Sequence, residues 1–170
     1  SDTEVLFQLY LRDGEAMLSE LNGIFALAIW DGRQKRMLLA RDPLGVKPLY
    51  YNQSHGKFSF SSEIRSLMRL IPASVSPNYV ALHRYMTFLY CPGEDTPFSG
   101  VLKLDPGTAL WVRDGRIERK FRWYKLPAFR KVVRRINKDE SIQGTEKHLR
   151  KAVHRQMVSD VPVGAFLSGG

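Results

Sequence analysis

The chain has 170 residues, of which 44% are hydrophobic, and this suits one packed domain or slightly more while arguing against a disordered chain. No apolar run approaches the roughly 20 residues of a membrane-spanning helix, and the single cysteine, Cys91, excludes an internal disulfide framework and is compatible with the reducing cytoplasm. The formal net charge of +9 allows binding to nucleic acid or another acidic surface without specifying it.

The first residues predict a helix that ends at Gly14, followed by a short second helix carrying Met17 and Leu18. Ser1 and Glu4 have the spacing of a capping box, in which each side chain bonds a backbone amide of the first turn. Read from the residues alone, Asp2 is a negative charge in the first helical turn, where the helix dipole stabilises it.

Residues 24–61 predict an antiparallel meander. Residues 24–30 are apolar at every position, which predicts a strand covered on both faces. Further strands are predicted over residues 37–40, 46–51 and 58–61. A helix capped by Ser61 or Ser62 follows, and its predicted apolar face consists of Ile64, Leu67, Met68 and Ile71.

The tetrapeptide Asp42-Pro43-Leu44-Gly45 has the composition of a type I turn. Proline presets φ at the second position, and the side chain of Asp42 is expected to accept hydrogen bonds from backbone amides. Arg41 and Asp42 are expected to pair with each other or with the backbone and so fix this turn, because charges beside a tight turn are mostly structural.

The middle of the chain predicts a helix that restarts near Pro77, then two hairpins. The first hairpin would join residues 101–104 to residues 108–112 around Pro106-Gly107, and the second would return over residues 116–123. The apolar side of the helix is predicted from its spacing to consist of Val80, Leu82, Tyr85 and Met86.

The last part of the chain begins with a basic run and continues with a predicted helix and strand. Residues 129–138 read as a phosphate-binding patch or a solvated linker, and a charge run alone favours the linker. A helix is predicted over residues 139–160, and a strand over residues 161–167 runs into Ser168-Gly169-Gly170. Glycines after a strand let backbone amides converge on a phosphate.

Three stretches resemble the glutamine-hydrolysing asparagine synthetase family: LARDPLGVKPLYY at residues 39–51, FSFSSEIRSLM at residues 58–68 and VPVGAFLSGG at the end. The resemblance implies an α+β fold, a partial αββα sandwich with antiparallel sheets of the N-terminal nucleophile (Ntn) type. It places the C-terminal part of a glutamine amidotransferase domain at residues 1–126 and a linker at 127–138. The first helix and strand of an α/β ATP-pyrophosphatase domain would occupy residues 139–170.

The same resemblance implies two sets of site residues. Asp2 would hold the α-amino group of glutamine through a charge-assisted hydrogen bond. In the nucleotide site, Leu167 would contact ATP, and Ser168, Gly169 and Gly170 would face its pyrophosphate. Arg41, Asp42 and Lys47 would then have an alternative role, lining the path between the two active sites, and the role of Glu63 stays open.

Two features depart from the family pattern. The family's glutaminase uses a cysteine as its first residue, whose thiolate attacks the amide, whereas this chain begins with Ser1. The segments that clamp glutamine upstream and supply the oxyanion site are also missing. We therefore expect an interior slice of a larger enzyme, with no catalytic residue of its own and no activity by itself.

The resemblance implies that the parent protein hydrolyses glutamine and passes ammonia to an aspartate activated by ATP and Mg²⁺, yielding asparagine, glutamate, AMP and pyrophosphate. One alternative keeps this architecture but amidates another carboxylate or a cell-surface sugar. A second alternative is a basic nucleic-acid-binding module. The first interpretation implies glutamine and aspartate as substrates, neither nucleic acid nor membrane as a partner, and leaves a homodimer open.

Overall fold

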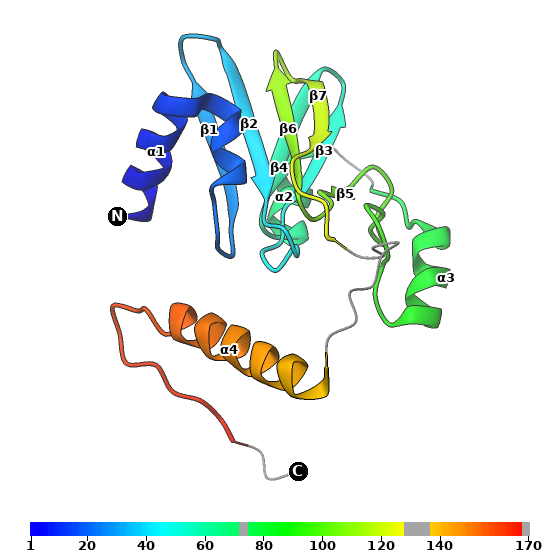
Figure 1. Cartoon of the computed structure of the whole chain (residues 1–170). Coiled ribbons are helices and arrows are strands. Elements are labelled where there is room, and N and C mark those ends of the chain that lie inside the picture. Colours follow the sequence, from blue (N-terminus) through cyan, green and yellow to red (C-terminus); the bar gives the residue numbers. More distant parts are fainter. Residues whose placement is uncertain (72–74, 128–136, 168–170) are drawn as a thin grey trace. The chain divides into compact units, whose positions relative to one another are not determined.

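The computed structural model describes residues 1–71, 75–127 and 137–167. The chain divides into two compact units, Ser1–Leu126 and Pro127–Gly170, and each is described by itself. The first unit combines helices with two antiparallel sheets (Figure 1), which confirms the mixed α and β composition expected from the sequence.

The two sheets take strands from distant parts of the chain. The larger sheet has the order β1-β2-β6-β7 and the smaller one β4-β3-β5, with every pairing antiparallel. The strand bounds are β1 Ala26–Asp31, β2 Arg36–Arg41, β3 Tyr50–Ser54, β4 Lys57–Ser61, β5 Leu102–Lys103, β6 Thr108–Arg113 and β7 Arg116–Arg122.

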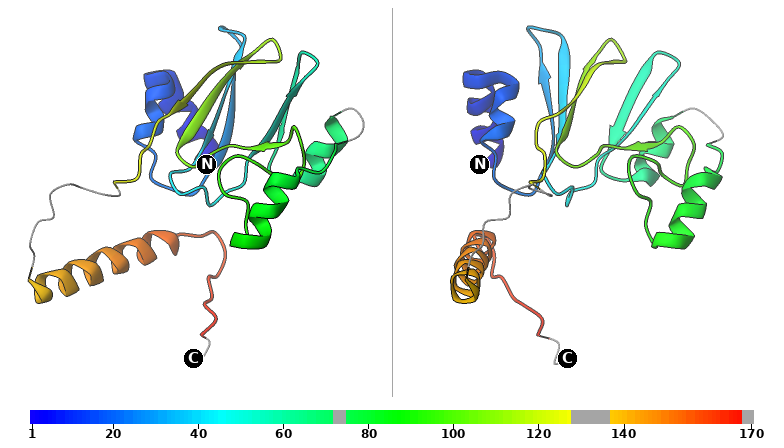
Figure 2. Two further views of the ribbon diagram at one scale, coloured as in Figure 1. Left: turned by 90° about the vertical axis from the view of Figure 1, so that its right-hand side faces the viewer. Right: turned by 45° about the vertical axis from the view of Figure 1, so that its right-hand side comes forward.

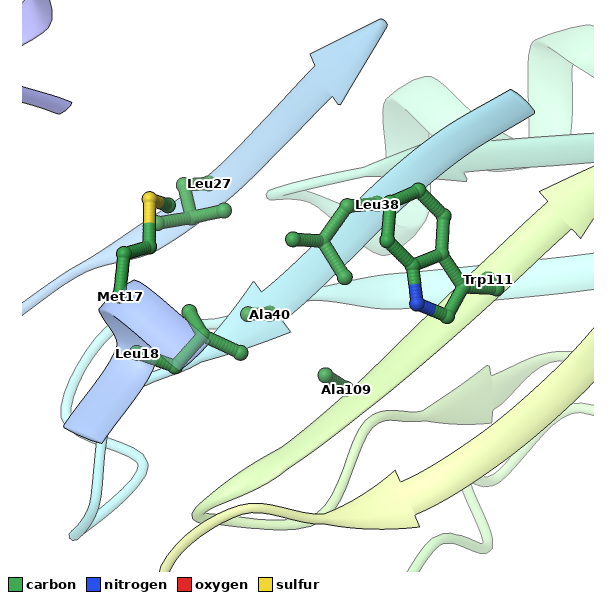
Figure 3. Close-up of a cluster of buried hydrophobic side chains, with 7 residues drawn as sticks. All are labelled: Met17, Leu18, Leu27, Leu38, Ala40, Ala109 and Trp111. Carbon is green, nitrogen blue, oxygen red and sulfur yellow. The ribbon is translucent and has the colours of Figure 1, made fainter. Parts of the chain in front are cut away.

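The central strands β2 and β6 are buried on both faces because successive side chains point to opposite sides of the sheet. On one face, Leu39 and Leu110 pack against Tyr51 and Leu104 from the smaller sheet and its flank. The opposite face forms a second cluster, shown in Figure 3, whose members are Met17, Leu18, Leu27, Leu38, Ala40, Ala109 and Trp111.

Two short helical segments cover the outer face of the larger sheet (Figure 2). Helix α1 spans Asp2–Asp13 and the 3-10 helix η1 spans Gly14–Ser19, which supplies the fully buried Met17 and Leu18. The predicted capping box is wrong, because the Ser1 hydroxyl makes no cap hydrogen bond. The first turn is closed instead by the amides of Glu4 and Val5, which donate to the Ser1 carbonyl.

Helix α2 (Ile64–Leu70) contacts β3 and β4 through the predicted apolar face, with Leu67 fully buried. Helix α3 (Tyr79–Phe88) begins at Asn78, whose side chain accepts a hydrogen bond from the Ala81 amide. Its predicted apolar side is wrong: Val80, Tyr85 and Met86 are exposed, and the helix buries Ala81 instead.

Three strand predictions need correction. Strand β1 is covered on one face only, and Trp30 is 64% exposed. The reason is that the hydrophobic cluster beneath the smaller sheet includes residues of β2 and β6 but none of β1. Strand β3 begins at Tyr50, four residues later than predicted. Strands β5 and β6 form no hairpin, since the chain crosses from one sheet to the other at Pro106-Gly107.

Two hairpin tips meet at one end of the first unit. Asp114 and Gly115 turn between β6 and β7, and His55 and Gly56 turn between β3 and β4, with positive φ at all four residues. A Cβ added at Gly115 would overlap the backbone carbonyl of Gly56. The two sheets therefore approach each other backbone to backbone at these tips.

The second unit contains α4 (Lys138–Gln156), whose first turn is capped by the Asn137 side chain, which accepts a hydrogen bond from the Glu140 amide at 2.8 Å. Residues 161–167 are not a strand in the structure, which corrects that prediction. A β-strand needs a neighbour to satisfy its backbone groups, and the described part of this unit contains none. None of the described helices combines the length and apolar character needed to cross a membrane.

Candidate functional site

Asp2, the residue expected to bind glutamine, lies at the first position of α1 with an exposed side chain. Among the described residues its carboxylate makes no side-chain hydrogen bond and no ion pair. Such a carboxylate can accept hydrogen bonds from an external cation without first breaking an internal pair.

Helix α1, which carries Asp2, contains no fully buried side chain. Leu6, Leu9 and Tyr10 pack partly against the core cluster beneath the helix. The Tyr10 hydroxyl donates a 2.9 Å hydrogen bond to Oδ2 of Asp31, at the end of β1. Burial and this bond raise the pKa of Tyr10 to about 12.

Asp31 serves two elements at once. Its Oδ1 accepts hydrogen bonds from the amides of Arg33 and Gln34, both at 2.9 Å, and so closes the turn between β1 and β2. Its Oδ2 accepts the bond from Tyr10. The Gln34 amide and the Tyr10 hydroxyl hold the pKa of Asp31 below its usual range, because they stabilise the carboxylate form.

Glu15 holds η1 to the sheet. Its Oε2 accepts hydrogen bonds from the indole of Trp111 on β6 and from the guanidinium of Arg119 on β7. Burial alone would raise the pKa of Glu15, but the bonds from Arg119 and Trp111 together bring it below its ordinary value. The segment that follows α1 is therefore clamped to two strands far away in the sequence.

The turn after β2 is built on a buried acid, and it confirms the sequence prediction. The Gly45 amide donates to the Asp42 carbonyl at 3.1 Å, and Leu44 does not have the positive φ that a type II turn would need at this position. The Asp42 carboxylate, only 1% exposed, accepts the amides of Leu44, Val46 and Lys47 at 2.9–3.1 Å.

Arg41 fixes the same turn from the other side. Its guanidinium donates to the backbone carbonyls of Gly45, Lys47 and Leu104 at 2.5–2.6 Å. Burial lowers its pKa because the charged form loses solvation. Arg41 and Asp42 thus act through the backbone, which is one of the two structural arrangements expected for them.

The turn forms one wall of a cavity of about 290 Å³. Arg122 and Asp105 both line it, with 3.9 Å between guanidinium and carboxylate. The lining residues are Pro43, Leu44, Asp105, Pro106, Arg122, Tyr124 and Leu126. Both apolar and charged groups therefore border this open hollow beside the Arg41–Asp42 turn.

The expected nucleotide site falls at the edge of the described chain. Leu167 is 98% exposed, while Ser168, Gly169 and Gly170 lie outside the described residues. In the described ranges no group of three or more His, Cys, Asp or Glu side chains is arranged to hold a metal ion. Of the four residues expected to contact ATP, only Leu167 therefore lies in the described part of the chain.

Sequence reasoning missed the Tyr10–Asp31 and Glu15–Trp111–Arg119 contacts. Both join residues more than twenty positions apart, and hydrophobic periodicity carries no information on such pairs. The dipeptide Asp31-Gly32 gave a partial indication of the Tyr10–Asp31 contact. An aspartate at the start of a turn uses one carboxylate oxygen for the turn amides, so its other oxygen is free to accept a further hydrogen bond.

Comparison with protein families divides the chain in two. Residues 1–124 match a glutamine amidotransferase domain. Residues 144–170 match an asparagine synthase domain. The first match covers the unit that contains both sheets, Asp2 and the Arg41–Asp42 turn.

Curated relatives match over the whole chain. Asparagine synthetase [glutamine-hydrolyzing] 1 of Bacillus subtilis is 37% identical over all of this chain and 26% of its own length. A putative asparagine synthetase [glutamine-hydrolyzing] 2 of Methanocaldococcus jannaschii is 35% identical, with 33% of its length covered. Amidase chry2 of Gibberella zeae is 30% identical, with 25% covered.

The chain thus spans between a quarter and a third of the length of these relatives. Its similarity to them is continuous from one end to the other, and it crosses from the first family model into the second. Because the first model accounts for most of its residues, the chain belongs to the glutamine amidotransferase domain family and continues into the start of an asparagine synthase domain.

Proposed function

We propose that this chain is part of a glutamine-dependent asparagine synthetase that converts aspartate, glutamine and ATP into asparagine, glutamate, AMP and pyrophosphate. The observation that carries the proposal is the order of the two matches, a glutamine amidotransferase domain followed by an asparagine synthase domain in one chain. Two relatives that match over the full chain are named as glutamine-hydrolysing asparagine synthetases.

In this proposal the first unit binds glutamine, and its layered sheets belong to an N-terminal nucleophile sandwich. Asp2 accepts hydrogen bonds from the α-ammonium of the substrate, for which its exposed carboxylate at the start of α1 is suited. The nucleophile that attacks the amide is supplied by residues other than those of this chain. The hydrogen bonds of Arg41 and Asp42 fix the turn over residues 42–47.

ATP and Mg²⁺ would activate the carboxylate acceptor in the synthase domain. Leu167, Ser168, Gly169 and Gly170 are proposed as the start of that nucleotide site, by their resemblance to the family's pyrophosphate loop. The remainder of the pocket would come from residues that this chain does not contain.

A second candidate keeps glutamine as the donor and changes the acceptor. Its support is Amidase chry2, a full-chain match whose name does not mention asparagine. The two candidates differ in the product, so amide formation should be followed by mass spectrometry with aspartate and with other carboxylates. We expect asparagine to form only when aspartate, ATP and a nitrogen donor are all present. Failure to form asparagine under these conditions would favour the second candidate.

The role of Asp2 is tested by Asp2→Asn in the full-length protein. We expect the KM for glutamine to rise about 10- to 100-fold, because a charge-assisted hydrogen bond to the substrate is weakened. Synthesis with free ammonia in place of glutamine should be unchanged. Asp139→Asn is the matched control, since Asp139 also lies in the first turn of a helix and is exposed. An unchanged KM in Asp2→Asn would contradict the assignment.

A further inference from the structure

We propose that Tyr10 and Asp31 are positioning residues for glutamine recognition. Their hydrogen bond holds α1 against the larger sheet and thereby keeps Asp2 where it meets the α-ammonium of the substrate. This inference rests on the role proposed above for Asp2, and it extends that role to two residues that do not touch the substrate.

Helix α1 packs on the sheet through one face only, so apolar contacts alone do not fix its orientation. It buries no side chain completely, and Val5, Phe7 and Leu11 are exposed. The contacts of Leu6 and Leu9 with the core cluster are apolar, and apolar packing is non-directional. The Tyr10 hydroxyl supplies a bond of defined length and direction, which fixes the roll and the axial position of the helix.

Asp31 is a rigid acceptor for this bond. Its other oxygen is already held by the amides of Arg33 and Gln34, so its carboxylate cannot follow a displaced helix without opening the β1–β2 turn. Figures 1 and 2 show α1 lying alongside the sheet that ends at this turn. The bond from Tyr10 therefore ties the helix to the sheet and not to a mobile side chain.

The anchors of α1 are concentrated near its C-terminal end. Tyr10 is in the third turn, and Glu15 fixes η1 just beyond the helix. Asp2 lies eight residues before Tyr10, about 12 Å along the axis at 1.5 Å per residue. A tilt of about 10° around Tyr10 would move Asp2 by about 2 Å, enough to disturb a substrate hydrogen bond.

The experiment compares two substrates in the full-length protein: glutamine, and the analogue glutaramate, which lacks the α-amino group. Tyr10→Phe removes only the hydroxyl, and Asp31→Asn keeps an oxygen for the turn while placing an NH2 group, which cannot accept a hydrogen bond, opposite the Tyr10 hydroxyl. We expect both variants to raise the KM for glutamine about 3- to 10-fold with kcat little changed. The KM for glutaramate, which makes no ammonium contact, should stay within twofold, as should ammonia-dependent synthesis.

Tyr79→Phe is the matched control, because Tyr79 is exposed and its hydroxyl makes no hydrogen bond among the described residues. If Tyr10→Phe lowers the melting temperature but leaves the KM for glutamine unchanged, Tyr10 is purely structural and the inference is overturned. If Asp2→Asn raises that KM and Tyr10→Phe does not, the proposed function survives and this inference fails. A wild-type protein that hydrolyses no glutamine would overturn both.

Discussion

Arg41 and Asp42 are neighbouring buried charges that are satisfied almost entirely by backbone atoms. Asp42 accepts three amides of the turn that it begins. Arg41 donates to three carbonyls, one of which belongs to Leu104. The turn and the acceptor role of Asp42 were predictable from four residues. The bond to Leu104 was not, because it spans 63 positions and depends on where the second sheet packs.

Replacing Asp42 tests the energetic weight of this turn. In Asp42→Ala the three amides lose their acceptor inside the protein, and we expect the free energy of unfolding to fall by about 3–4 kcal/mol. Chemical denaturation followed by circular dichroism measures the change. Glu63→Gln is the control, since the exposed Glu63 side chain makes no cap hydrogen bond. A loss below about 1 kcal/mol in Asp42→Ala would show that water replaces the carboxylate.

At the scale of elements, η1 is fixed to β6 and β7 by one carboxylate, that of Glu15. The folded state lowers the pKa of Glu15 below the ordinary value of 4.5. A carboxyl group with a lowered pKa stabilises the fold above its ordinary pKa, and that stabilisation is lost as the pH falls through the folded value.

We therefore expect Glu15→Gln to be less stable than the wild type at pH 7, and the difference to shrink as the pH is lowered below about 4.5. Urea unfolding at a series of pH values measures both curves. Glu20→Gln is the comparison, because Glu20 makes an exposed ion pair with Arg12 and should change stability little at any pH. A difference for Glu15→Gln that persists undiminished at pH 3 would contradict the ionic role.

Element predictions failed where they depended on what covers a face. Periodicity predicted the face of α2 correctly because Leu67 packs on strands β3 and β4, which immediately precede that helix. Periodicity failed for α3, whose Met86 and Val80 are exposed. The unbroken apolar run likewise misled for β1, whose second face has no cover among the described residues. Residues 161–167 have strand composition but no described neighbouring strand, and composition alone cannot supply one.

At the scale of the whole molecule, the net charge of +9 left a nucleic-acid-binding module open. The structure shows that the cations of β7 are largely paired: Arg119 with Glu15, Lys120 with Glu94, and Arg122 with Asp105. Paired cations release fewer counterions from a phosphate backbone, which weakens non-specific binding. These three cations of β7 are thus paired with acids, whereas most of the basic run at residues 129–138 lies outside the described residues.

We expect a fluorescently labelled single-stranded RNA or duplex DNA to bind this chain with a Kd weaker than about 10 μM at 150 mM salt. Fluorescence anisotropy in a salt titration measures this affinity. The control repeats the titration with polyglutamate added as a competing polyanion, which measures how much of the binding is non-specific electrostatic attraction. Sub-micromolar binding with a steep salt dependence would revive the nucleic-acid interpretation.

The broad architecture was more predictable than its connections. The positions of β2 and β4 were predicted to within a residue or two, and the β6–β7 hairpin follows from the Asp114-Gly115 turn. The assignment of β5 and β6 to different sheets was not predictable, because Pro106-Gly107 suits a hairpin as well as a crossover. In the structure the chain crosses to the larger sheet at this point, where the Gly107 amide donates a hydrogen bond to the Asp42 carbonyl.

The meeting of the hairpin tips at Gly56 and Gly115 limits how this domain tolerates change in length. Exposed loop tips are usually where proteins accept inserted residues, because few contacts are lost there. Here the two tips touch through backbone atoms, with no room for a side chain at Gly115. An affinity tag or a natural insertion in either hairpin would push the sheets apart, so the two loops are constrained to change length together.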